Sequence, residues 1–137
     1  MSTELHLLPP NGTSPLEPDE ILGRLRAEFA FVETSREEGA RRLLESISRW
    51  ERTNPRVFEV AGVEEGSGED VRVALIAALR ASIPRACYVR FGDDAEHSHG
   101  QGIVPSTDGF LIVVDQPWQQ VLAERLARVT GYVVHRI

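Results

Sequence analysis

The sequence predicts an α+β fold, a single layered domain with one mixed β-sheet and about four helices. Three observations support this prediction. Apolar residues recur at helical spacing in some segments and alternate, or run together, in short β-rich segments elsewhere. The two kinds of segment are interspersed, so that strand–strand and strand–helix–strand connections both occur. A length of 137 residues suits one domain, residues 1–137.

The N-terminal part predicts a strand, a helix and a second strand. ELHLLP, residues 4–9, has the composition of a short strand that two prolines end. A helix is expected from Pro18, because proline suits the first helical turn and Asp19 and Glu20 suit its positive end. FAFVET, residues 29–34, is rich in β-forming residues and predicts the second strand.

The next helix has the clearest pattern in the chain. Ser35 and Glu38 form a capping box at its start, apolar residues follow at helical spacing, and Asn54-Pro55 ends it. RVFEVAGV, residues 56–63, then alternates between apolar and polar residues and predicts a third strand.

Residues 71–82 fit two patterns. The first few residues of VRVALIAALRAS alternate as in a strand, but four alanines in the segment favour a helix. We predict a helix that follows the acidic loop 64–70 and ends before Pro84. The alternative is a β-hairpin with residues 57–63.

The C-terminal part predicts three strands and one helix. The strands are residues 85–92, 110–117 and 132–137. The helix is expected to have Asp115 as its cap and Pro117 in its first turn, and to end near Gly131. FLIVVDQP, residues 110–117, is the most apolar strand and is expected at the centre of the sheet. The order of strand, loop, strand, helix and strand fits half of a ferredoxin-like split βαβ arrangement, which implies no function.

Composition excludes several kinds of partner and chemistry. The formal net charge is −6, with 15 acidic residues and 8 arginines in residues 1–70 and 6 acidic residues and 7 arginines in residues 71–137. A net-acidic chain without a basic run is unsuited to nucleic acid or to an anionic membrane surface. No apolar run approaches the roughly 20 residues of a membrane span, and no secretion signal precedes the first strand. We therefore expect a cytoplasmic protein.

Residue usage also restricts the catalytic chemistry. All 15 basic residues are arginine, so a Schiff-base lysine and a phosphate-loop lysine are excluded. The single cysteine, Cys87, excludes an internal disulfide and every CxxC site, and its apolar surroundings favour a buried thiol. No GxSxG or GxGxxG motif occurs.

The candidate site lies in GDDAEHSHGQG, at the start of an expected loop that spans residues 92–109. His97 and His99 are separated by one residue, so in an extended chain both imidazoles face one side. Together with Asp94 they are the predicted ligands of a divalent metal such as zinc, manganese or iron, and Asp93 or Glu96 offers a further carboxylate. The preferred interpretation is a solvated glycine-rich connection between strands, which needs the same polarity and no metal.

The other two histidines, His6 and His135, lie in the first and last predicted strands. If these strands are neighbours, their imidazoles come close together. The preferred interpretation is that both are partly exposed strand residues without a further role.

Two kinds of function follow from these patterns. The leading hypothesis is a non-enzymatic interaction or regulatory domain that binds another protein or a second copy of itself. The alternative is a small metal-dependent or histidine-dependent enzyme, hydrolase-like, that uses residues Asp93–His99. A small-molecule binding domain with the same loop as a lid belongs to this second class. No organic cofactor is predicted; a divalent metal at Asp94, His97 and His99 is the one inorganic candidate.

Overall fold

The structure, a computed structural model, describes residues 2–59, 64, 66–105 and 109–136. Within these ranges it contains four α-helices and two three-stranded antiparallel sheets, which confirms the predicted α+β class. In chain order the elements are β1 (Thr3–Leu8), α1 (Pro18–Glu28), β2 (Phe31–Ser35), α2 (Arg36–Arg52), the 3₁₀ turn η1 (Pro55–Phe58), α3 (Ser67–Ser82), the 3₁₀ turn η2 (Ile83–Arg85), β3 (Cys87–Gly92), β4 (Ser98–Ile103), β5 (Phe110–Val114), α4 (Pro117–Thr130) and β6 (Val133–Arg136).

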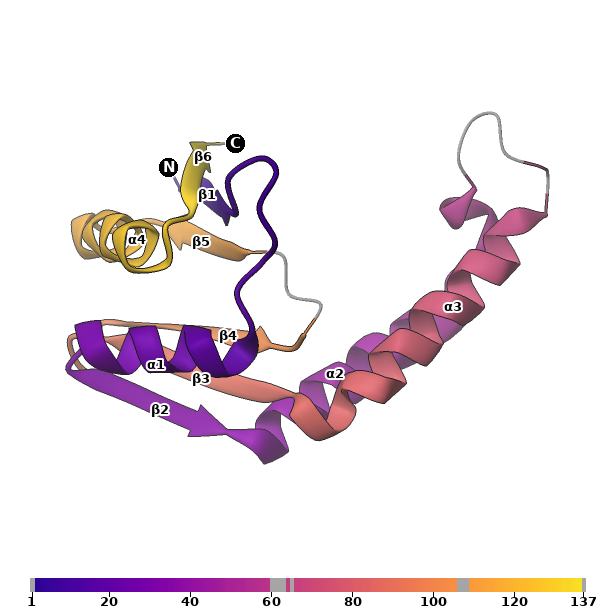
Figure 1. The fold of residues 1–137 in the computed structure, drawn as a ribbon, viewed down its shortest axis with the longest axis horizontal. Helices are drawn as coiled ribbons and strands as arrows, with labels where there is room; N and C mark the ends of the chain where they lie inside the picture. The colour runs from indigo at the N-terminus through magenta and orange to yellow at the C-terminus, as the bar shows by residue number, and fades with distance from the viewer. Residues whose placement is uncertain (1, 60–63, 65, 106–108, 137) are drawn as a thin grey trace.

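The strands form two sheets, with the orders β5-β1-β6 and β2-β3-β4, in place of one mixed sheet (Figure 1). β1 pairs antiparallel with both β5 and β6, so β5 and β6 run parallel to each other and α4 connects them. This is a split βαβ unit, but its central strand comes from the N-terminus. The expectation that residues 110–117 form a central strand is wrong, since β5 lies at an edge and leaves Leu111 and Val113 exposed.

One main core lies between the two sheets and the helices α1 and α4. Strand alternation turns Leu5 and Leu7 of β1 inward, where they are 1% and 0% exposed. The Phe91 ring of β3 reaches across the core, with its centroid 5.1 Å from that of Phe29 and 6.2 Å from that of Phe110. The other core residues are Ile21, Leu25, Val89, Ile103, Ile112, Leu122, Ala123, Leu126 and Tyr132.

Helices α2 and α3 lie side by side and project from the body of the molecule, as Figure 1 shows. We call α2, η1 and α3 the arm. The Ser35 hydroxyl accepts the backbone N–H of Glu38 at 3.0 Å, which confirms the predicted cap at the start of α2. Where α2 leaves the body, Gly39 packs against the backbone of Cys87. A second, smaller core joins the arm to the body through Leu43, Ile47 and Ala86, with Ile76, Leu79 and Ile83 packed around them.

The segment after α2 differs from the prediction. Residues 56–58 of the expected strand 56–63 lie in the 3₁₀ turn η1, and residues 60–63 lie outside the described residues. Pro55 at the first position and the Asn54 side chain, which accepts the backbone N–H of Arg56 at 3.0 Å, favour a helical turn here. The helix predicted for residues 71–82 is confirmed, and it begins earlier, at Ser67.

The expected loop 92–109 contains a strand. β4 pairs with β3 over its whole length, so that only residues 93–97 form the turn between them. Glycine permits this because Gly102 and Gly100 stand opposite Tyr88 and Arg90, and a Cβ at Gly100 would lie 2.0 Å from the Tyr88 hydroxyl oxygen. Gly100 therefore makes room for the Tyr88 side chain of the neighbouring strand. Residues 106–108 lie outside the described residues.

Among the described residues, no helix has both the length and the apolar content that crossing a membrane requires.

Candidate functional site

The polar residues of the β3–β4 turn hold the turn itself together. Oδ1 of Asp94 accepts the backbone N–H groups of Glu96 at 2.9 Å and of His97 at 2.8 Å, and lies 2.9 Å from Nδ1 of His97. The hydrogen bond from the His97 side chain, followed by that from its backbone, lowers the pKa of Asp94. This is the Asx-turn geometry that favours aspartate in short connections.

The same turn is fastened to helix α4. The His97 and Trp118 rings meet edge to face, with centroids 5.2 Å apart and an interplanar angle of 83°. Nη1 of Arg125 donates to Asp93 at 2.7 Å, and the same guanidinium bonds to Glu28 in α1. The acidic and imidazole groups of the turn thus join three elements of the body.

His99 lies apart from Asp94 and His97. It stands opposite Phe91 across the β3–β4 pair, with ring centroids 5.6 Å apart, and its Nε2 lies 3.4 Å from Oε1 of Gln101. Its burial beside the core lowers its pKa. The structure therefore brings together Asp94 and His97 but not all three predicted ligands. In the described ranges no group of three or more histidine, cysteine, aspartate or glutamate residues is arranged to hold a metal. The metal assignment to Asp94, His97 and His99 stays a prediction.

No nucleophile in the described part of the chain is paired with His97. The Ser98 hydroxyl donates to the backbone oxygen of Ala95 at 2.9 Å and accepts from Arg90 at 3.3 Å. Cys87 is buried and stands opposite Ile103. Ile103 is four residues along β4 from His99, so Cys87 and His99 are separated by about 13 Å along the strands. The enzyme hypothesis gains no catalytic pair from this geometry.

The burial of His99 leads to a prediction for stability against pH. In the unfolded chain an imidazole takes up a proton near pH 6.5, whereas the lowered pKa delays protonation of His99 in the folded state. Below about pH 6.5 the unfolded chain therefore binds more protons at His99 than the folded chain does, and the free energy of unfolding falls as the pH drops. Above about pH 6.5 His99 is neutral in both states and does not affect the free energy of unfolding.

Urea unfolding at pH 7.5 and 5.5 (chosen to bracket the pH at about 6.5 where free imidazole titrates) measures this loss. His99→Gln is expected to reduce the difference between the two pH values. His97→Gln, at an exposed imidazole, serves as the matched control. An equal loss in the wild type and in His99→Gln would contradict the assignment.

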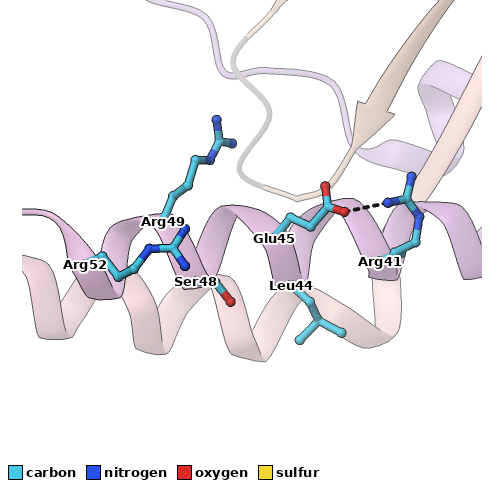
Figure 2. Close-up of a pocket in the computed structure, with 6 residues that line it drawn as sticks. All are labelled: Arg41, Leu44, Glu45, Ser48, Arg49 and Arg52. Carbon is cyan, nitrogen blue, oxygen red and sulfur yellow. Dashed lines mark hydrogen bonds and ion pairs between the residues drawn. The ribbon is translucent and has the colours of Figure 1, made fainter.

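Two hollows in the surface lie on the arm and its base. One, shown in Figure 2, is lined by residues of α2 alone: Arg41, Leu44, Glu45, Ser48, Arg49 and Arg52. A single helix has no opposing wall, so this hollow does not enclose a small molecule. The other lies where α2 meets β3 and β4 and is floored by Cys87 and Ile103. Neither includes a residue of the β3–β4 turn, so the predicted lid covers neither of them.

Helix α3 is unusual because it is rich in apolar residues but largely exposed to solvent. Nine of its sixteen residues are apolar, namely Val71, Val73, Ala74, Leu75, Ile76, Ala77, Ala78, Leu79 and Ala81, but the only residue of α3 that is fully buried is Gly68. Val71 and Val73 are 46% and 55% exposed. A helix that is apolar on more than one face is normally buried in a larger core.

Comparisons with protein-family models, with curated proteins and with solved structures give no match to this chain. The exposed face of α3 was not predicted from the sequence. The apolar content of residues 71–82 is visible in the sequence. The packing of α2 decides which face of α3 is covered and which face stays exposed.

Proposed function

We propose that the protein is a non-enzymatic interaction domain that pairs with a second copy of itself through the exposed face of α3. The single observation that carries this proposal is that the nine apolar residues of α3 include none that is fully buried. Leaving this surface in water is unfavourable by roughly 25 cal/mol per Å², which favours an additional partner.

The inner face of α3 is already in use. Ile76 and Leu79 pack on the small core that Leu43 and Ile47 of α2 help to form. The remaining apolar residues of α3 lie on its other faces. One stripe recurs at intervals of three, four and three residues and consists of Val71, Ala74, Ala78 and Ala81. All four are exposed. This stripe faces away from α2 and is open to a second helix.

Pairing of two arms in an antiparallel sense suits the charges of the arm. Glu69 and Asp70 lie at the start of α3 and Arg80 lies near its end, so antiparallel helices place the acidic end of one beside the basic end of the other. A parallel arrangement would instead bring the acidic ends together. Helices α2 and α3 together hold seven arginines and six acidic residues, a net charge of +1, and the rest of the chain therefore carries −7. Antiparallel arms keep the two acidic bodies at opposite ends.

The size of the contact predicts a weak dimer. A helix of sixteen residues is about 24 Å long, so two arms that meet along α3 cover less than the roughly 800 Å² per partner of a standard stable interface. Small side chains in the stripe allow the helix axes to approach to about 8 Å. We expect a dissociation constant in the micromolar range.

The proposal is tested by the mass of the full chain in sedimentation velocity, from about 1 µM to about 1 mM. The wild type is expected to approach twice the 15.2 kDa of one chain at high concentration. Ala78→Glu, which buries a charge in the paired stripe, is expected to remain a monomer. Ala27→Glu, at an exposed alanine in α1, is the matched control and is expected to behave as the wild type.

A wild-type chain that stays monomeric throughout, or an Ala78→Glu variant that still forms dimers, would contradict the proposal. Circular dichroism of the variants separates a lost contact from a lost fold.

A further inference from the structure

The outer face of the β5-β1-β6 sheet brings two histidines together. β1 and β6 are antiparallel neighbours, and His6 stands directly opposite His135 in their register. Leu5 and Leu7 point into the core, so strand alternation places His6 on the outer face. A cross-strand partner shares the face of the residue opposite, so both imidazoles project from the same side of the sheet.

The surroundings of the pair favour a cation. Leu111 of β5 stands on the other side of His6, and Leu8 and Val133 form the adjacent row. Glu4 is on the same face as His6, two residues earlier in β1, and supplies a negative charge. Arg136 stands opposite Leu5 and hence projects from the other face. The two imidazoles therefore lie between apolar residues and a carboxylate, without a cation at the neighbouring positions of the pair's own face.

We propose that His6 and His135 form a two-imidazole site for a divalent transition-metal ion of the zinc and nickel class. Imidazole nitrogen binds these ions at about 2.0–2.1 Å. Residues directly opposite in an antiparallel pair have Cβ atoms about 4.5–5.5 Å apart, a separation from which two imidazole rings reach one ion. Among the described residues Glu4 does not complete a group of three ligands with the pair, so water or an added ligand completes the coordination.

The site has a structural consequence for the C-terminal strand. All four residues of β6 are exposed, and β1 is the strand to which β6 is hydrogen-bonded. An ion shared by His6 and His135 links β6 to the central strand of its sheet. Metal binding to the folded state then raises the stability of the protein by mass action. This inference is independent of the pairing of the arms.

The test is calorimetric titration of the untagged full chain with zinc and, separately, nickel chloride. One ion per chain is expected, with affinity in the micromolar range. His6→Asn and His135→Asn each leave one imidazole and are expected to weaken binding by about 100-fold. Val113→Asn, at an exposed residue of β5 on the same face of the sheet, is the matched control and is expected to bind as the wild type. At about 100 times the dissociation constant, the ion is expected to raise the melting temperature by roughly 5–10 °C.

The location is checked by amide NMR, where paramagnetic nickel is expected to broaden signals of β1 and β6. Binding that persists unchanged in His6→Asn or in His135→Asn, or that is lost in Val113→Asn, would overturn the proposal. The absence of binding at about 1 mM metal would also overturn it.

Discussion

Replacing Phe91 with alanine is expected to lower the free energy of unfolding by about 3–5 kcal/mol. The Phe91 side chain is fully buried at 0% exposure, and its ring contacts the rings of Phe29, His99 and Phe110. These contacts link the β2-β3-β4 sheet with α1 and the β5-β1-β6 sheet. Truncation leaves a cavity where the two sheets meet, because strands fixed by their ladders cannot close around a missing ring.

Urea unfolding followed by circular dichroism measures this effect. Phe31→Ala is the matched control, because Phe31 is half-buried at the start of β2 and contacts Arg90 through its ring face. The control is expected to cost about 1 kcal/mol. A loss in Phe91→Ala that is no larger than the loss in Phe31→Ala would show that the two sheets do not share one core.

Gly39→Ala is expected to destabilise the protein by about 2 kcal/mol or more, although alanine is the better helix former. A Cβ at position 39 would lie 2.6 Å from Cα of Cys87 and 2.7 Å from its backbone nitrogen. The obstacle is the backbone of a buried strand and not the end of a flexible side chain. Helix α2 must therefore move away from β3, which separates the base of the arm from the body.

Gly23→Ala provides the opposite case. Gly23 is also within a helix, α1, but no atom lies within 4 Å of the position its Cβ would occupy. This change is expected to stabilise the protein by about 0.5–1 kcal/mol. The two variants are compared by urea unfolding, and hydrogen exchange of α2 and α3 shows whether the arm loosens in Gly39→Ala. Equal stabilisation of both variants would contradict the packing of α2 on β3.

The residues of the predicted metal site illustrate why local sequence did not determine their roles. Asp94 and His97 were expected as ligands, and they do lie together at 2.9 Å. The partners that explain them, Trp118 and Arg125, come from α4, which is more than twenty residues away in sequence. His99 was expected on the same side of an extended chain, but its strand turns it toward Phe91. Only the packing of α4 and β3 decides these contacts.

His6 and His135 show the reverse situation. The sequence predicted the alternation along each strand. It also predicted that the two imidazoles come close together if the first and last strands are neighbours. The pairing of the first strand with the last could not be predicted from the sequence, because strand order depends on which faces the rest of the chain covers. The structure fulfils the condition by placing β1 between β5 and β6.

By itself the sequence determined the elements whose cause is local. The periodicity of α2 and its Ser35 cap, the alanine content of α3 and the strand composition of β1 and β3 act within a few residues, so they could be interpreted without a fold. Tertiary structure alone decided the division into two sheets, the edge position of β5, the strand β4 within a glycine-rich stretch, and the exposure of α3. Each of these depends on a surface contributed by a distant part of the chain: β1 occupies the centre of its sheet, Tyr88 fills the space over Gly100, and α2 covers only one face of α3.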